Sequence, residues 1–151
     1  MDPAPIRVAI ASDHAAVAMK AELADWLRGE GHPVLDLGPD DDRSVDYPDY
    51  GAKLARVIAA GEAERGVALC GSGIGIAIAV NRFPACRCAL VSDGLSARLA
   101  RSHNDANVLA MGARLIGIET ARECVNQFLH TEFTGGRHTA RVDTLARLPG
   151  D

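Results

Sequence analysis

Aromatic residues are scarce in this 151-residue chain, at 4% of the total, and an excess of basic residues is missing as well. The formal net charge of -4 argues against a protein that binds nucleic acid or an anionic membrane surface. No apolar stretch approaches the length of a membrane-spanning helix. What the chain does have is 48% hydrophobic residues, enough for an aliphatic core, and a length that suits one domain, predicted to span 1–151.

Cysteine is also sparse and has no recognisable spacing. The four cysteines form no CxxC pair and no zinc-binding pattern, so we expect neither a disulfide framework nor a metal site. We interpret Cys86, Cys88 and Cys124 as reduced packing residues. The opening Met-Asp-Pro-Ala-Pro has no basic and apolar signal pattern, and the expected location is the cytoplasm.

The fourth cysteine, Cys70, ends an apolar run and begins the glycine-rich stretch 71–75. This pattern is typical of a buried parallel strand followed by a tight turn and the start of a helix. Glycines let the backbone approach a ligand closely, and the free N–H groups of such a turn point at a bound anion. A thiol at this junction is a candidate for the active site, although an inert thiol beside a structural turn would give the same pattern.

Spacing excludes four familiar loops. Ile76 occupies the position where a dinucleotide fingerprint needs glycine, and also the arginine position of a cysteine phosphatase loop. A Walker loop would need Gly-Lys followed by Ser or Thr, and a serine nucleophile elbow around Ser72 would need glycine where Cys70 stands. The loop is therefore predicted to bind an anion without being a nucleotide loop.

Apolar periodicity predicts an α/β fold. Runs at 6–12, 34–37, 67–70, 88–92 and 108–111 have the character of buried strands. Helical patterns lie between them, a last long helix covers about 118–129, and the polar C-terminal segment is expected to be helical from about Thr139. Strands that alternate with helices predict a five-stranded parallel sheet covered on both faces.

Polar residues follow the strands, and we expect them to meet at one rim of the sheet. The carboxyl ends of parallel strands share an edge where open α/β sheets bind ligands. The groups expected there are Asp13-His14, Cys70 with its glycines, Ser92-Asp93 and, just before the fifth strand, His103-Asn104-Asp105. Taken singly, each has a structural explanation, such as a helix cap for Asp13.

Two arginines near the C-terminus, Arg137 and Arg141, are four residues apart and would share one face of a helix. Together with Arg114 they are candidates for holding an anion, and in an acidic protein they suggest a phosphorylated small molecule. An exposed basic tail is the simpler alternative.

These motifs together resemble the type B ribose-5-phosphate isomerases, a family that includes allose-6-phosphate isomerase and the subunits of galactose-6-phosphate isomerase. The resemblance covers about 6–148. It is carried by Ser12-Asp13-His14, Asp46-Tyr47-Pro48, Cys70-Gly71-Ser72-Gly73-Ile74-Gly75, Ala79-Val80-Asn81, His103-Asn104-Asp105-Ala106-Asn107-Val108-Leu109 and Gly135-Gly136-Arg137-His138.

The resemblance implies a Rossmann-like three-layer α/β/α sandwich and cofactor-free, metal-independent isomerisation of ribose 5-phosphate to ribulose 5-phosphate in the pentose phosphate pathway. It also implies a homodimer, or a tetramer, whose active sites are shared between subunits, with the basic segment 134–151 reaching the partner. Cys70 would be the base, in the branch of the family that lacks a glutamate at the position of Ile76.

Further roles follow from the same resemblance. His103 would open the sugar ring with help from Asp13, and Ser72 with the loop amides would stabilise the enediolate. The sugar would contact Asp13, His14, Tyr47, Gly71, Ser72, Gly73, Ile74, Gly75 and Asn104, and the phosphate would contact His14, Arg114, Arg137 and Arg141.

Alternatives stay open at this point. The substrate could instead be galactose 6-phosphate, allose 6-phosphate or a tetrose phosphate, since the sequence does not show the pocket walls. A non-catalytic sugar-phosphate-binding subunit is a further alternative, although Cys70, Ser72 and His103 are all present. Ile76 disfavours a nucleotide-binding module.

Overall fold

The structure is a computed structural model that describes residues 4–150, so the ends of the predicted domain 1–151 and of the segment 134–151 lie outside it. Its centre is a five-stranded parallel sheet in the order β2-β1-β3-β5-β4. The strands are β1 (Val8–Ser12), β2 (Val34–Asp36), β3 (Arg65–Cys70), β4 (Cys88–Leu90) and β5 (Val108–Gly112). The predicted α/β fold is confirmed.

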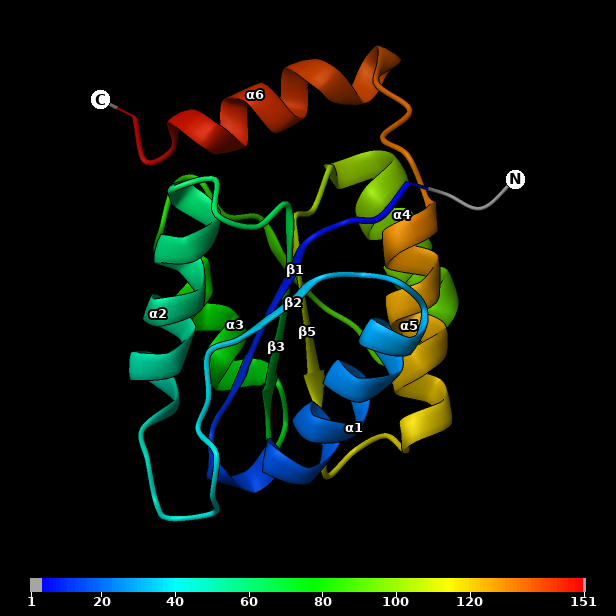
Figure 1. The fold of residues 1–151 in the computed structure, drawn as a ribbon. Helices are drawn as coiled ribbons and strands as arrows, with labels where there is room; N and C mark the ends of the chain where they lie inside the picture. The colour runs from blue at the N-terminus through cyan, green and yellow to red at the C-terminus, as the bar shows by residue number, and fades with distance from the viewer. Residues whose placement is uncertain (1–3, 151) are drawn as a thin grey trace.

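Helices cover both faces of this sheet, which gives three layers (Figure 1). On one face lie α2 (Tyr47–Ala59) and α3 (Ile74–Val80); on the other lie α1 (Val17–Gly29), α4 (Gly94–Asn104) and α5 (Ile118–His130). Two short 3-10 helices, η1 (His14–Ala16) and η2 (Gly136–His138), precede α1 and α6 (Thr139–Arg147).

The central strands are hydrophobic throughout because both of their faces are covered. All five residues of β1 and of β5 are buried, and β3 is buried from Gly66 to Cys70. Alternate residues point to opposite layers, so Ile10 belongs to the core beneath α1, α4 and α5, whereas Ala9 belongs to the core beneath α2 and α3. The core is mostly aliphatic, and Phe128 on α5 is among its largest fully buried side chains.

Small differences from the sequence prediction occur at element ends. The fourth strand ends at Leu90 instead of residue 92, since Asp93 caps α4 by accepting hydrogen bonds from the amide and hydroxyl of Ser96. The sequence pattern predicts the next helix over 95–101, whereas α4 runs from Gly94 to Asn104. These shifts leave the order of elements unchanged.

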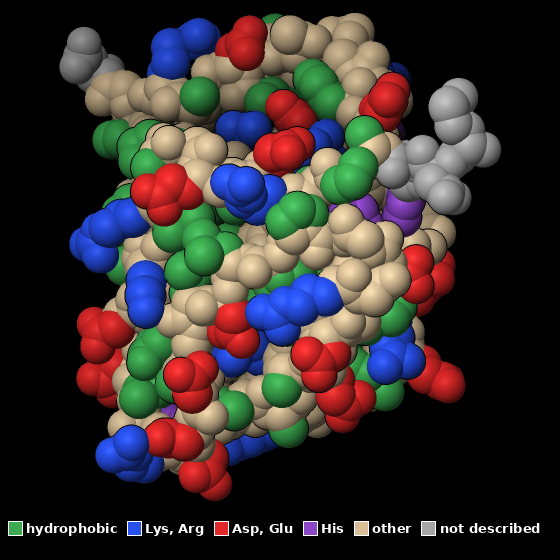
Figure 2. All heavy atoms as spheres, in the orientation of Figure 1, with side chains coloured by type: hydrophobic (Ala, Val, Ile, Leu, Met, Phe, Trp, Pro, Cys, Tyr) green, Lys and Arg blue, Asp and Glu red, His purple; other side chains and the backbone are tan. Residues whose placement is uncertain are grey.

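The outer surface mixes charges of both signs. Acidic and basic side chains are interspersed over the face drawn in Figure 2, without a continuous basic area on it. Within residues 4–150, none of the helices has the length and apolar character needed to cross a membrane.

Candidate active site

The strand order changes sides between β1 and β3. From β1 the chain crosses first to β2 on one side, and β3 then lies on the other side of β1. The carboxyl ends of β1 and β3 therefore border the crevice where open α/β sheets bind ligands. Asp13 directly follows β1, and Cys70 is the last residue of β3.

The glycine-rich loop after β3 (residues 71–75) holds the thiol of Cys70 in a fixed environment. The amide of Gly73 donates a hydrogen bond to Cys70 Sγ at 3.1 Å, and the amide of Ile74 donates to Ser72 Oγ at 3.2 Å. Gly73 has φ of 77°, which suits glycine because other L-residues rarely adopt it. The Gly73 amide thus points at the thiol that ends β3, whereas the Ile74 amide is bonded within the loop to the Ser72 hydroxyl.

The loop also packs tightly against the end of β5. A Cβ atom at Gly112 would lie 2.6 Å from the backbone of Ser72, so the two backbones touch only because Gly112 lacks a side chain. The amide of Arg114 donates to the carbonyl of Gly71 at 2.9 Å, and the Arg114 side chain lies against Gly71. This contact brings a guanidinium beside the loop.

A hollow of about 280 Å³ opens over this loop. Its walls bring together most of the residues predicted for the sugar site, and they add Leu115, which sequence reasoning missed although it follows Arg114 directly. The lining consists of Asp13, Tyr47, Cys70, Gly71, Ser72, Gly75, Arg114 and Leu115. Only 4% of Cys70 is exposed, so its thiol can be reached from this hollow but is otherwise enclosed.

Three predicted residues have identifiable local roles at this rim. Asp13 is buried and caps η1, since its carboxylate accepts a hydrogen bond from the amide of Ala15 at 2.9 Å, as the structural explanation anticipated. The ring of Tyr47 lies so close over Gly75 that a Cβ there would approach it to 2.6 Å. His14 Nδ1 lies 3.1 Å from the amide and the carbonyl of Val45, outside the walls of the hollow.

The expectation that His103, Asn104 and Asp105 would meet Cys70 at one rim is wrong within a single chain. These residues come before β5, whereas Cys70 is the last residue of its parallel neighbour β3. The start of one parallel strand and the end of the next lie at opposite edges of the sheet. The register pairs Gly66 with Val108 and Cys70 with Gly112, which separates the two edges by about 13 Å or more.

The C-terminal candidates lie at this amino edge too. Figure 1 shows α6 crossing the end of the sheet opposite to η1. Arg137 belongs to η2 and not to the same helix as Arg141, which differs from the predicted shared helix face. A hollow of about 740 Å³, lined by Asn104, Phe83 and Leu145 among others, separates α6 from the loop before β4.

His103 is stacked on His138 at the amino edge. Their ring centroids lie 4.3 Å apart with an interplanar angle of 13°. Burial, followed by the positive charges of His103, Arg137 and Arg141, lowers the pKa of His138. Among residues 4–150 no ion pair involves Arg137 or Arg141, so this cluster holds unneutralised positive charge suited to an anion.

The remaining cysteines lie apart from the hollow, and all four thiols are free. Burial raises the pKa of Cys86 and of Cys124 to about 11, and that of Cys88 to about 12. These thiols therefore stay protonated near neutral pH and serve as packing groups. Within residues 4–150, no three His, Cys, Asp or Glu side chains gather in a way that could hold a metal ion.

Known proteins share both this sequence and this fold. The family model described as Ribose/Galactose Isomerase matches residues 8–145. Ribose-5-phosphate isomerase B of Escherichia coli is 38% identical over 142 residues, which cover 94% of this chain and 95% of that protein. D-erythrulose-4-phosphate isomerase of Pectobacterium atrosepticum is also 38% identical over 142 residues, 93% of each chain.

A solved structure gives the same result. The crystal structure of a ribose 5-phosphate isomerase from Thermotoga maritima superimposes with a TM-score of 0.93 at 46% identity, covering 95% of this chain and 99% of that one. The resemblance and the Rossmann-like sandwich predicted from the motifs are confirmed. The chain belongs to the ribose/galactose isomerase family and is a sugar-phosphate isomerase.

Proposed function

We propose that the chain interconverts ribose 5-phosphate and ribulose 5-phosphate through an enediolate, with Cys70 as the base. The observation that carries this proposal is the thiol of Cys70 in a small hollow, hydrogen-bonded by the Gly73 amide at 3.1 Å. The thiolate is the form of a cysteine that can accept a proton, and the Gly73 amide fixes the position of the sulfur that would do so. Names of relatives such as ribose-5-phosphate isomerase B support the substrate.

In the proposed reaction, the Cys70 thiolate removes the proton from C2 of the open-chain aldose. The C–H electron pair forms the C1–C2 double bond, and the carbonyl electrons move to O1. The loop amides and the Ser72 hydroxyl then stabilise the oxyanion, as preorganised donors do. Return of the proton to C1 and transfer of the O2 proton to O1 complete the ketose, so atoms and charge balance.

Phosphate binding would position the reacting carbons. Arg114 lies beside the glycine-rich loop, and Arg137 and Arg141 supply unneutralised charge at the other edge of the sheet. Fixed cations at a distance from the reacting bond supply binding energy and orientation without taking part in proton transfer. We propose His14 as a further phosphate contact, and Tyr47 and Asn104 as contacts of the sugar.

The separation of the residues at the amino edge from Cys70 supports the proposal of a homodimer with shared sites. His103, Asn104, Arg137 and Arg141 lie at the amino edge and cannot reach Cys70 of the same chain, so a partner would have to present them. Exposed apolar side chains adjoin the loop and offer a surface for a second copy: Ile74 and Ile78 on α3, and Leu90 on the edge strand β4, packed against Gly73.

Mixing two inactive variants tests this arrangement. Cys70→Ala and His103→Gln should each lose nearly all ribose 5-phosphate turnover while binding inorganic phosphate. After dissociation and random reassociation in equal amounts, half the dimers would hold one intact site, giving about one quarter of the wild-type rate. A mixture as inactive as its components would contradict shared sites, and substantial activity of Cys70→Ala alone would contradict the assignment of the base.

One observation favours a second substrate. The relative named D-erythrulose-4-phosphate isomerase is as similar to this chain as the Escherichia coli ribose-5-phosphate isomerase B. We therefore keep a four-carbon sugar phosphate as the alternative. Its turnover at a higher kcat/KM than that of ribose 5-phosphate would replace the proposed substrate and retain the mechanism.

A further inference from the structure

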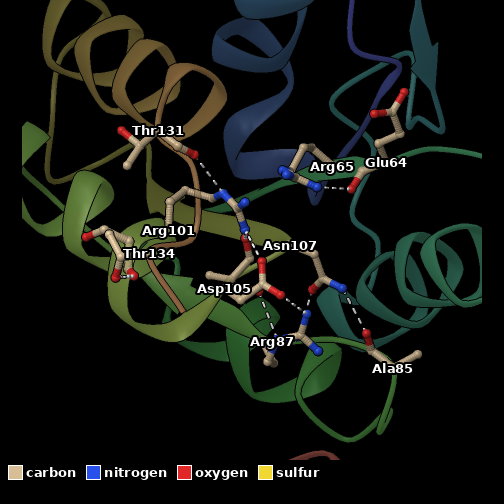
Figure 3. Close-up of polar contacts among 11 residues, drawn as sticks. Glu64, Arg65, Ala85, Arg87, Arg101, Asp105, Asn107, Thr131 and Thr134 are labelled. Carbon is tan, nitrogen blue, oxygen red and sulfur yellow. Dashed lines mark hydrogen bonds and ion pairs between the residues drawn. The ribbon is translucent and has the colours of Figure 1, made fainter. Parts of the chain in front are cut away.

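Asp105 ends α4 in an unusual backbone conformation. With φ of 47° and ψ of 42°, it is the one non-glycine residue among 4–150 whose φ is positive. Left-handed geometry is unfavourable for a residue with a side chain, so surrounding contacts must hold it. Two guanidinium groups do so: Arg101 Nη1 lies 2.7 Å from Oδ1, and Arg87 Nη2 lies 3.4 Å from Oδ2 (Figure 3).

Arg101 is almost fully enclosed, with 3% of its surface exposed, and it links three segments. Its Nη1 also donates to the carbonyl of Ala106 at 2.8 Å, and its Nε donates to the carbonyl of Thr131 at 3.2 Å. Figure 3 shows the guanidinium reaching from α4 toward the chain just after α5 on one side and toward Asp105 on the other. One side chain therefore joins the end of α4 to the chain that leads toward η2.

A second contact strengthens the same connection. The amide and the hydroxyl of Thr134 both donate to the carbonyl of Ser102, at 3.0 and 2.8 Å. Ser102 directly precedes His103, and Thr134 lies three residues before Arg137. The bonds made by Arg101 and Thr134 thus lie close to His103 and Arg137, the two residues that we propose enter the partner's active site.

We propose that Arg101, paired with Asp105, is a positioning residue that sets the distance between His103 and the adjacent residues Arg137 and His138. Neither Arg101 nor Asp105 lines the hollow over Cys70. The inference rests on the proposed function, since it assumes that His103 and Arg137 act on one substrate. Its physical basis is that a misplacement of about 1 Å far from the reacting atoms can reduce a rate about 100-fold.

Arg101→Lys is the variant that tests this proposal most directly. Lysine keeps the charge, but its single nitrogen cannot replace the fork that bonds Asp105, Ala106 and Thr131 at once. Asp105→Asn is a gentler second variant, because asparagine tolerates the left-handed conformation and only the carboxylate charge is lost. Arg98→Lys, on the exposed face of the same helix, is the matched control.

Two readouts follow the proposed positioning, and a third reports whether the rest of the fold is intact. NMR spectra of the histidine rings report the stack without any turnover, because stacked rings shift each other's signals upfield. The inhibition constant of inorganic phosphate against sugar-phosphate turnover reports the cationic cluster. The rate of Cys70 alkylation reports whether the opposite edge stays intact.

The proposal predicts that Arg101→Lys loses the upfield shifts of His103 and His138, raises the phosphate inhibition constant about tenfold, and leaves Cys70 alkylation unchanged. Asp105→Asn should shift both readouts in the same direction by less, and Arg98→Lys should shift neither. Unchanged histidine signals and phosphate inhibition in Arg101→Lys, even with a lower melting temperature, would overturn it. If the wild-type protein turned over no sugar phosphate, the proposed function would fail, while the NMR spectra would still decide whether Arg101 holds the stack.

Discussion

Replacing Gly73 by alanine should destabilise the protein more than the same change at a glycine that has neither a positive φ nor a close neighbour. Gly73 has φ of 77° at the start of α3, and its amide donates to Cys70 Sγ. An added Cβ would lie 2.7 Å from the carbonyl carbon of Met111 and 2.7 Å from Leu90 Cδ1. The leucine end can move, but the β5 backbone at Met111 is buried in the middle of the sheet.

The cost has two parts. Left-handed φ in a residue with a side chain costs about 1–2 kcal/mol. Overpacking against a fixed neighbour typically adds about 1–3 kcal/mol. Together they predict a loss of about 2–5 kcal/mol, which for a chain of this size lowers the melting temperature by about 4–20 °C.

Thermal and urea unfolding of Gly73→Ala measure this loss, with Gly29→Ala as the control. Gly29 is the last residue of α1, and an added Cβ there would meet nothing within 4 Å. Because alanine is the better helix former, this control should be neutral or stabilising by up to about 1 kcal/mol. A Gly73→Ala protein that melted within about 1 °C of wild type would refute the reasoning.

Three further predictions concern other contacts. Gly75→Ala should leave stability nearly unchanged but raise KM. An added Cβ would approach the half-exposed Tyr47 ring to 2.6 Å, and the ring can swing away from the hollow. An unchanged KM would count against a role for that ring. Iodoacetamide at pH 8 should modify Cys70 before the other three cysteines, because their raised pKa values of about 11 to about 12 keep them protonated. Peptide mass mapping that found another cysteine modified first would contradict this. Lys20→Met removes the buried partner of Asp36, to which Lys20 Nζ is bonded at 2.7 and 2.8 Å. Because a quarter of the Asp36 side chain is exposed, urea unfolding should show the free energy of unfolding falling by about 1–3 kcal/mol, less than for a fully buried pair. No measurable fall would show that water replaces the ion pair.

Periodicity was enough to predict the layers of the fold. The buried strands are continuous apolar runs, and amphipathic helices alternate with them, so local pattern and global arrangement agree. Element ends were less predictable because they depend on caps. Asp93 accepts hydrogen bonds from Ser96 and so fixes the start of α4. Asp105 ends α4 with the help of Arg101, one turn earlier on the same helix, and of Arg87 from the loop before β4.

The candidate site was predictable in part. Cys70 is the last residue of β3, and Asp13 and Ser72 lie one and two residues after strand ends, so the sheet brings the three together. His103 was placed at the wrong edge because the rule for strand ends applies to residues after a strand, not before it. The link through Arg101 joins residues 30 positions apart and leaves no periodic trace in the sequence, so only the structure reveals it.

Turnover of ribose 5-phosphate by the purified protein tests the central claim most directly, measured beside allose 6-phosphate, galactose 6-phosphate and a tetrose phosphate. The account predicts the highest kcat/KM for ribose 5-phosphate, and loss of that activity in Cys70→Ala. Preference for another of these sugars would contradict the proposed substrate. Turnover of none of them by folded protein would contradict the isomerase mechanism built on Cys70 and favour a sugar-phosphate-binding subunit.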